Sequence, residues 1–201
     1  MIVFHEESKT FHLYNNEISY VFKILKNNQL GQLYYGKRIH DKPDFSYLVE
    51  KCGRPMTSYI FEGDRSFSLE HIRQEYPVYG TTDYRHPAIE IMQENGSNIS
   101  EFKYVGYEIL KGKPSLKGLP ATYTESEEEA ETLKIILKDS LTGAKLTLLY
   151  TIFSKGSAIA RSAHICNEGE KVLHLQTMMS LNLDLPDKDY VWMQLSGAWS
   201  R

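Results

Sequence analysis

Two acidic residues in an irregular, aromatic-rich stretch are the strongest candidates for chemistry in this sequence. Glu75 and Asp83 lie within residues 74–88, a segment with two prolines, three tyrosines and no helical or strand period. Glycoside hydrolysis needs two carboxylates about 5 to 9.5 Å apart, and a loop could bring these two together. The alternative, which we favour, is that Asp83 forms a side-chain turn and pairs with Arg85, which would hold the loop in shape.

Other ingredients of common active sites are missing from the sequence. The seven histidines are scattered, and the cysteines, Cys52 and Cys166, form neither a zinc motif nor a disulfide framework. His164 and Cys166 are two residues apart, which is typical of ordinary neighbours on one face of a strand. GxSxG, P-loop and GxGxxG patterns are also absent. The sequence therefore predicts no metal site and no cofactor.

Composition and charge exclude two further classes of function. Charged residues make up 24% of the 201 residues and AVILMFWYC residues 41%, which is globular composition. A formal net charge of -3 gives no electrostatic reason to expect nucleic acid as a partner. The sequence shows neither a secretory signal nor an apolar run of about 18 residues, as a transmembrane helix needs. We therefore expect no membrane segment and a cytoplasmic protein.

The first third of the chain alternates as antiparallel strands do. The strands predicted in this part are residues 11–14, 18–24 and 31–36, the first two forming a hairpin. In the third strand, Leu33 and Tyr35 are predicted to share one face. Residues 38–63 break the pattern and predict a long loop, or an arm that reaches a neighbouring molecule. Residues 67–72 fit a short strand and a single helical turn equally well.

The remaining two thirds are also dominated by alternation. Further strands are predicted at residues 88–92, 102–111, 133–138, 146–152, 173–185 and 189–195. The Asn95-Gly96 pair predicts a hairpin turn, and the acidic run 125–131 predicts a little helix or a solvated edge. The long strand 173–185 would belong to a large sheet. With ten to fourteen strands and no amphipathic helix, the predicted fold is all-β, a large antiparallel sandwich formed by residues 1–201 as one domain.

Motifs spread along the whole chain resemble one known family. The densest runs from Gln74 to Ala88 and reads Gln-Glu-Tyr-Pro-x-Tyr-Gly-x-Thr-Asp-Tyr-Arg-x-Pro-Ala. The other matching segments are residues 67–69, 94–97, 107–114, 118–123, 129–133, 161–163 and 197–201. In this order they resemble the N-terminal domain of bacterial α-galactosidases of glycoside hydrolase family 36.

The resemblance implies a galactose-mutarotase-like β-supersandwich that precedes a (β/α)8 catalytic barrel and a small C-terminal β domain. The family hydrolyses α-galactosides such as raffinose and melibiose with retention, and both of its catalytic aspartates belong to the barrel. No catalytic residue is therefore expected in this chain. The closing Gly-Ala-Trp-Ser-Arg also predicts a longer parent chain, so we expect residues 1–201 to be an inactive fragment of an intracellular enzyme.

The resemblance also assigns residues. The family's tetramers use N-terminal domains to complete the active-site mouth of a neighbouring subunit, which implies a sugar contact by Arg65 and, across a looser match, by Glu50. Trp199 and Arg201 would mark the junction with the barrel. The signature positions of the loop are Tyr76, Tyr79, Gly80, Asp83, Arg85 and Pro87. The resemblance makes this loop a packing surface and moves the galactoside chemistry into the barrel.

Two other hypotheses compete with an ancillary domain. Fourteen tyrosines suit a carbohydrate-binding module, because flat rings combine contact area with a polar group. A stand-alone aldose mutarotase-like epimerase would use a histidine and a carboxylate as acid and base, and its candidates here are His86 with Glu75 or Asp83.

Overall fold

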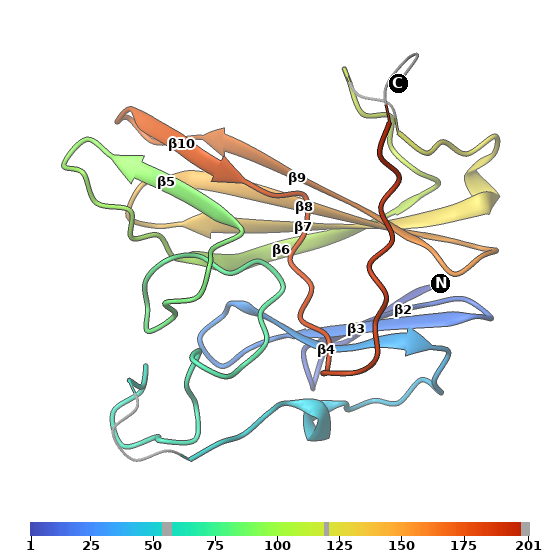
Figure 1. Cartoon of the computed structure of the whole chain (residues 1–201), viewed down its shortest axis with the longest axis horizontal. Helices are drawn as coiled ribbons and strands as arrows, with labels where there is room; N and C mark the ends of the chain where they lie inside the picture. The colour runs from blue at the N-terminus through green and yellow to red at the C-terminus, as the bar shows by residue number, and fades with distance from the viewer. Residues whose placement is uncertain (54–57, 119–120, 198–201) are drawn as a thin grey trace.

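Two antiparallel sheets of four strands form the body of the protein, as the computed structural model in Figure 1 shows. The structure describes residues 1–53, 58–118 and 121–197. The first sheet has the order β1 (Ile2–His5), β2 (Thr10–Tyr14), β3 (Ile18–Ile24) and β4 (Leu30–Lys37). The second has the order β6 (Phe102–Lys111), β7 (Ala130–Asp139), β8 (Ala144–Phe153) and β9 (Ile159–Asn167). A small third sheet pairs β5 (Ile89–Gln93) with β10 (Leu173–Met178).

Helical structure in the described part of the chain is confined to two short 3-10 turns, η1 (Ser46–Leu48) and η2 (Glu127–Glu129). The second lies in the acidic run for which a little helix or a solvated edge was expected. None of the helices among the described residues has the length and apolar character needed to cross a membrane. The prediction of an all-β antiparallel sandwich is confirmed.

The main core lies between the first sheet and the other two, which face it across the sandwich (Figure 1). Aromatic rings from opposite sheets meet there: the ring centroids of Phe22 and Tyr150 are 5.0 Å apart, and those of Phe11 and Tyr107 are 5.2 Å apart. Burial follows the strand period, so that buried and less buried residues alternate along much of β7 and β8. Alternation in the sequence predicts these strands well because one face of each meets the core.

The opposite face of the first sheet is covered by an irregular arm, of which the structure describes residues 38–53 and 58–66. Its main anchor is Phe45, which is fully buried against Val21 and Leu33. Leu33 faces this outer side because of a β-bulge in the pairing of β3 with β4, whereas Tyr35 packs edge-on against Tyr20. The prediction that Leu33 and Tyr35 share one face is therefore wrong, since a bulge resets the alternation.

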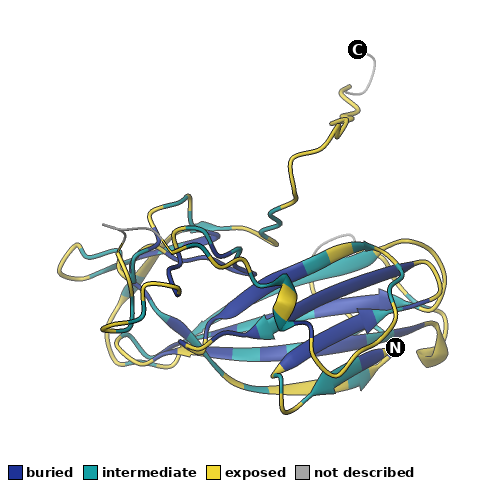
Figure 2. Ribbon diagram, turned by 90° about the horizontal axis from the view of Figure 1, so that it is seen from below, coloured by how far each residue is buried: buried dark blue, intermediate teal, exposed yellow. Residues whose placement is uncertain are grey.

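Two of the predicted strands near the C-terminus are wrong. The strand expected at residues 173–185 ends at Met178 and belongs to a two-stranded sheet, with a bulge between Leu175 and Thr177. Residues 189–195 are not a strand, and Val191 and Trp192 are about 90% exposed. Figure 2 shows this part of the chain projecting away from the sandwich. An apolar alternation predicts a strand only where another strand is available to pair with it.

Two smaller expectations also differ from the structure. Asn95-Gly96 does form a turn, in which the Gly96 N–H donates to the Gln93 carbonyl over 2.9 Å. It does not close a hairpin, because β5 pairs with β10 while β6 pairs with β7. Residues 67–72 form turns and bends, neither a strand nor a helix. Their buried side chains, Phe67, Leu69 and Ile72, pack with Leu25 in a satellite cluster.

Candidate functional site

The segment that carries the family pattern, the signature loop at residues 74–88, is fixed at its start by the first sheet. The Glu75 N–H donates to the Leu30 carbonyl and the Gln32 N–H donates to the Arg73 carbonyl, each over 3.0 Å. The loop is thereby joined to the edge of β4 through a single antiparallel bridge between Gln74 and Gly31. Its two prolines keep the rest out of helical conformations, and its last residue leads directly into β5. The loop is thus a rigid bridge between the first sheet and the third.

A tight two-residue turn forms the tip of the loop. Gly80 and Asp83 exchange backbone hydrogen bonds of 3.0 and 3.3 Å around Thr81 and Thr82. Both threonines have positive φ, +49° and +74°, a region that β-branched residues rarely adopt. Gly80 has a φ of +122°, and a Cβ there would lie 2.8 Å from the side chain of Ile99. Glycine is therefore required at this signature position.

Glu75 lies at the centre of a fully buried polar cluster. Its carboxylate accepts hydrogen bonds from the hydroxyls of Tyr20 (2.5 Å) and Tyr150 (2.9 Å). The guanidinium of Arg161 lies 3.1 Å from the same carboxylate, and both side chains are almost completely shielded from solvent. Arg161 also donates to the Tyr20 hydroxyl over 3.0 Å and to the Asn182 carbonyl over 3.0 Å. Strands β3, β8 and β9, the signature loop and the chain around Asn182 are joined at this point.

The electrostatics of this cluster favour fixed charges over proton transfer. Burial, followed by the nearby charge of Glu75, raises the pKa of Tyr20 and of Tyr150 well above the ordinary tyrosine value. Burial alone would lower the pKa of Arg161, but Tyr150 and Glu75 beside it raise that pKa on balance. The tyrosines therefore remain hydrogen-bond donors and the arginine remains charged. Because Glu75 is fully buried, no substrate can reach it.

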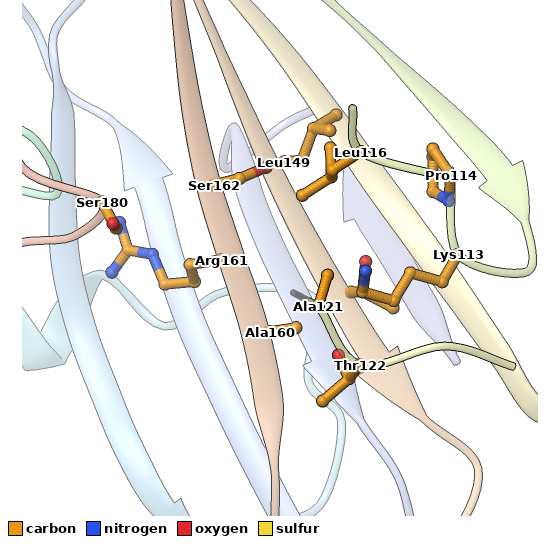
Figure 3. Close-up of a pocket in the computed structure, with 11 residues that line it drawn as sticks. Lys113, Pro114, Leu116, Ala121, Thr122, Leu149, Ala160, Arg161, Ser162 and Ser180 are labelled. Atoms are coloured by element: carbon orange, nitrogen blue, oxygen red, sulfur yellow. The ribbon is translucent and has the colours of Figure 1, made fainter. Parts of the chain in front are cut away.

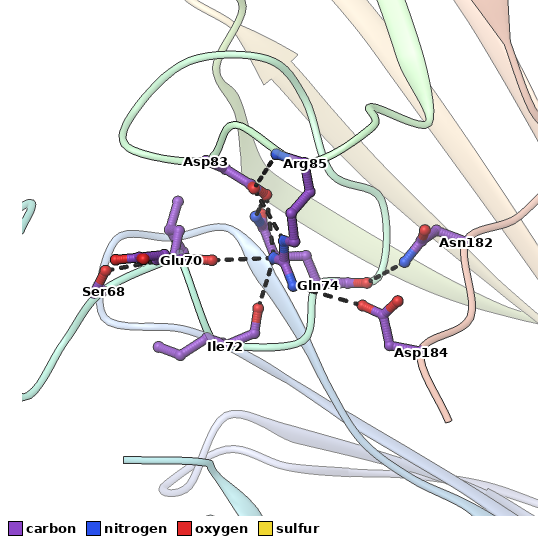
Figure 4. Close-up of polar contacts among 9 residues, drawn as sticks. Ser68, Glu70, Ile72, Gln74, Asp83, Arg85, Asn182 and Asp184 are labelled. Carbon is purple, nitrogen blue, oxygen red and sulfur yellow. Dashed lines mark hydrogen bonds and ion pairs between the residues drawn. The ribbon is translucent and has the colours of Figure 1, made fainter. Parts of the chain in front are cut away.

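Asp83 forms a second buried cluster, drawn in Figure 4. Its carboxylate accepts bonds from the Gln74 amide, from the Arg85 N–H (3.1 Å), and from Arg85 Nε (3.0 Å) and Nη2 (3.2 Å). Arg85 Nη2 also donates to the carbonyls of Leu69 (3.0 Å) and Ile72 (2.8 Å). The structure thus shows the Asp83–Arg85 pair expected from the sequence. Through Arg85, the Asp83 carboxylate holds the loop against the preceding residues, Leu69 and Ile72.

Of the remaining signature residues, some contact other parts of the protein and others are exposed to solvent. The Tyr76 hydroxyl donates to the Met179 carbonyl over 2.6 Å, while Tyr79 is 41% exposed and packs edge-on against Tyr84. Pro87 is half-buried. His86 is exposed, and the hydrogen bond given for its ring is to the carbonyl of Pro87. Both candidate carboxylates of a mutarotase-like site are buried and held by an arginine, so neither is free to act with His86 on a substrate.

The residues assigned to sugar contact lie in or beside the arm. Arg65 and Glu50 are both exposed, and neither side chain has a hydrogen bond or ion pair with another residue in the described part of the chain. Next to Arg65, the ammonium of Lys26 lies 2.9 Å from Asp64 and, with Ser66, lowers the pKa of that carboxyl to about 2. This pair fixes the end of the arm. The junction residues Trp199 and Arg201 lie outside the described residues.

The described residues contain no group of three or more His, Cys, Asp or Glu side chains placed to hold a metal ion. An open pocket of about 330 Å³ lies over β8 and β9, beside the loop that follows β6 (Figure 3). Leu116, Leu149 and Ala160 supply apolar lining, and Lys113 and Ser162 supply polar groups. None of the described residues that line it is acidic.

Sequence reasoning named Arg161 only as part of the matching segment 161–163 and missed its role, which is to complete the Glu75 cluster. Its signal was available in the period of β9, where Ile159, Ala163 and Ile165 pack against the core and Arg161 occupies the same register. A charged residue at an inward strand position needs a buried partner. Tyr20 and Tyr150 lie in the predicted strands 18–24 and 146–152, and a buried tyrosine hydroxyl there also needs a partner.

The comparisons with known proteins agree with this geometry. The profile described as "Glycosyl hydrolase family 36 N-terminal domain" matches residues 28–201. The chain is 41% identical over 200 residues to α-galactosidase AgaA of Geobacillus stearothermophilus, and 34% identical over 199 residues to α-galactosidase Mel36A of Lactobacillus acidophilus. The alignments cover 100% and 98% of this chain but 27% of each relative. The chain therefore spans about a quarter of the length of these curated relatives.

Solved structures give the same result. The crystal structure of an α-galactosidase from Lactobacillus brevis matches with a TM-score of 0.88 and 38% identity, over 92% of this chain and 25% of that one. A variant of AgaA from Geobacillus stearothermophilus, solved in complex with raffinose, matches with a TM-score of 0.81 and 42% identity, over 86% of this chain and 24% of that one. On the profile match, the fold and these similarities, the chain belongs to the glycosyl hydrolase family 36 N-terminal domain family.

Proposed function

We propose that this chain is the non-catalytic N-terminal domain of a retaining α-galactosidase that hydrolyses terminal α-galactosides such as melibiose and raffinose. The observation that carries the proposal is the profile match over residues 28–201, combined with α-galactosidase relatives of which the chain spans about a quarter. The raffinose complex of a similar enzyme supports the substrate class.

The chemistry of the site supports a non-catalytic role for this part of the enzyme. Glu75 and Asp83, the carboxylates with the best claim to catalysis, are both buried and both neutralised by an arginine. Retaining hydrolysis needs a nucleophile and an acid/base that touch the substrate. In this proposal those two groups belong to a (β/α)8 barrel, which packs against residues 1–201 as a single sandwich domain and is followed by a small C-terminal β domain.

The arm supports a further part of the proposal, an oligomeric enzyme. Arg65 and Glu50 are exposed on a long irregular segment, which suits contact with another molecule better than contact within the sandwich. We propose a homotetramer in which this segment completes the active-site mouth of a neighbouring subunit. We also place the enzyme in the cytoplasm, where Cys52 and Cys166, both free cysteines, would stay reduced.

The experiment compares two purified proteins on a chromogenic α-galactoside: residues 1–201 alone, and the same sequence continued through its parent gene. The expected result is turnover by the longer protein and none by residues 1–201. Turnover by residues 1–201, or an inactive longer protein, would sink the proposal. Calorimetry with galactose, melibiose and raffinose on residues 1–201 tests the competing binding module, which predicts a dissociation constant of about a millimolar or tighter.

A further inference from the structure

A segment without regular structure leads from β10 to the C-terminal part of the chain. This exit segment, residues 179–185, crosses from the third sheet towards the first (Figure 1). Its first residue is tied twice to the signature loop. The Met179 N–H donates to the Ala88 carbonyl over 2.8 Å, and the Met179 carbonyl accepts from the Tyr76 hydroxyl over 2.6 Å.

The middle of the exit segment is held from two sides. The side-chain amide of Asn182 donates to the Gln74 carbonyl over 3.0 Å, while its backbone carbonyl accepts from Arg161 over 3.0 Å. The Arg161 side chain is only 6% exposed. If the segment left this position, a donor of a buried charged group would lose its acceptor where little water can replace it. The Glu75 cluster therefore holds the exit segment as well as the sandwich.

The end of the segment makes two further contacts. The Asp184 N–H donates to the Gln32 side-chain carbonyl over 3.2 Å, and the Asp184 carboxylate lies 3.8 Å from Arg85 Nη1. Figure 4 shows Asn182 and Asp184 facing Gln74 and Arg85 of the signature loop. Contacts to the exit segment thus come from four groups of the loop, two carbonyls and two side chains, from Gln32 of β4 and from the buried arginine beneath them.

Apolar burial contributes little to holding this segment. Leu181 is 44% exposed and Leu185 is 38% exposed, and Leu183 is the leucine of the segment that packs against the core. A segment held mainly by burial would show the opposite pattern, with its leucines inward. The directional hydrogen bonds therefore decide its path.

We infer that the signature loop is a clamp on the exit segment. By holding residues 179–185 at both ends and in the middle, it fixes the direction in which the chain leaves the sandwich. Under the proposed function, on which this second step rests, the clamp sets the orientation of the catalytic domain relative to the N-terminal one. The conspicuous loop pattern is then a joint that aligns two domains, not a sugar-binding site.

Hydrogen exchange on residues 1–201 tests the clamp directly. The double variant Tyr76→Phe with Asn182→Ala removes two side-chain donors that link the loop and the segment, without touching Glu75 or Arg161. We expect amide exchange in residues 179–185 to rise roughly tenfold or more, because two ordinary hydrogen bonds are lost. Exchange in β7 and β8 should stay unchanged.

A matched double variant controls for the chemistry of the substitutions. Tyr34→Phe and Asn98→Ala delete the same atoms elsewhere, where Tyr34 donates to the Lys37 carbonyl and Asn98 donates to Glu90. The control should leave exchange in residues 179–185 at the wild-type rate. Unchanged exchange in the clamp variant would overturn the inference. So would a rise of the same factor in β7 and β8, because the segment would then open only with the whole sandwich.

A distance measurement tests whether the clamp fixes the direction in which the chain leaves the sandwich. Spin labels on Lys155→Cys and Asp187→Cys, both exposed positions, with Cys52 and Cys166 changed to serine, report the spread of distances between the sandwich and the exit. The clamp predicts a narrow distribution that broadens in the Tyr76→Phe, Asn182→Ala variant, and an unaltered width contradicts it. Neither measurement uses catalysis. An enzymatically inactive parent protein would refute the proposed function and leave the clamp standing.

Discussion

The signature loop and the arm are both irregular and rich in polar residues, but they use their charges in opposite ways. In the loop, Glu75 and Asp83 are buried and each is paired with an arginine. In the arm and at its end, Glu50 and Arg65 point into solvent without a described partner. The loop has the more conspicuous sequence pattern, and the arm has the charges that are free to bind.

The difference teaches which of the two regions can take part in recognition. A charge that is already desolvated and hydrogen-bonded can bind a ligand only if its present bonds break, and that costs more than the new contact returns. A solvated charge on an anchored arm pays no such cost. Substitutions test this difference. It would be contradicted if changing an arm charge lowered stability, or if changing a loop charge affected binding.

The largest effect is expected from removing the buried countercharge beneath the loop. Arg161→Met should lower the free energy of unfolding by about 3–5 kcal/mol, because it leaves the buried Glu75 charge uncompensated. Urea unfolding monitored by circular dichroism measures the change. Lys134→Met is the matched control, since its ion pair with Glu108 is largely exposed and should cost less than about 1 kcal/mol. Equal losses in the two variants would contradict the central role of the Arg161 cluster.

A smaller loss is expected at the second loop cluster. Asp83→Asn keeps the shape of the side chain but removes the charge that accepts three hydrogen bonds from Arg85. We expect a cost of about 1–3 kcal/mol in the free energy of unfolding, below that of Arg161→Met because Arg85 is 37% exposed. Thermal unfolding followed by calorimetry checks the order. A loss larger than that of Arg161→Met would place the key charge at Asp83.

The stability of the protein should depend on pH through the contact between Asp41 of the arm and His12 of β2. Asp41 accepts from Nδ1 of the buried His12 over 2.7 Å, so Nε2 of the neutral ring faces the Ser19 hydroxyl at 3.0 Å. The pKa of His12 is lowered from 6.5, mainly by burial. The hydrogen bond and the charge of Asp41 raise this pKa in part, and the charges of Arg38 and His5 lower it slightly. The unfolded chain then binds the proton first as pH falls below about 6.5. Stability is full above that pH and decreases below it.

Two measurements check this pH dependence. NMR titration should show His12 gaining its proton below the usual histidine value, and urea unfolding at pH 7.5 and pH 5.5 should show lower stability at the acidic pH. His12→Asn keeps a polar group at the site but cannot gain a proton, so it should reduce the difference between the two pH values. A difference of the same size in this variant would assign the effect to other groups.

The smallest effect on stability is expected from a substitution of Arg65, near the end of the arm. Arg65→Ala should change the free energy of unfolding by no more than about 0.5 kcal/mol, because the side chain is exposed and has no described partner. In the active parent enzyme, the same variant should raise KM for raffinose or melibiose if the arm reaches a neighbour's active site. Lys51→Ala, another exposed arm charge, is the control. A KM unchanged by Arg65→Ala would remove this residue from the proposed mouth.

Alternation in the sequence predicted a strand well where a neighbouring strand pairs with it along its whole length, as β7 pairs with the edge strand β6. Strands β6 and β8 were predicted almost to the residue, because each long alternation meets the core on one face. The same kind of alternation at residues 173–185 gave a strand that stops at Met178. There the backbone of Met179 bonds to the signature loop, and the backbone of Asn182 and Asp184 bonds to the side chains of Arg161 and Gln32 instead of to another strand. Periodicity shows which face is apolar but not what pairs with the backbone.

The candidate site was predictable only in its local part. The Asp83–Arg85 pair could be expected because its members are two residues apart in a turn-forming sequence. The Glu75 cluster could not, because Tyr20, Tyr150 and Arg161 lie 55 to 86 residues from Glu75 along the chain. Contacts at such separations depend on which strands meet, which the sequence pattern does not specify.

The sequence alone determined the class of this protein: an all-β sandwich, an acidic globular chain, and membership of a glycosidase family through its ordered motifs. Those properties follow from local periodicity, composition and residue identity. The tertiary structure alone decided the role of the signature loop. It showed that the loop's carboxylates are buried and neutralised, and that other groups of the loop bond to the exit segment. The sequence could not show this, because burial and long-range pairing arise only when distant strands pack together.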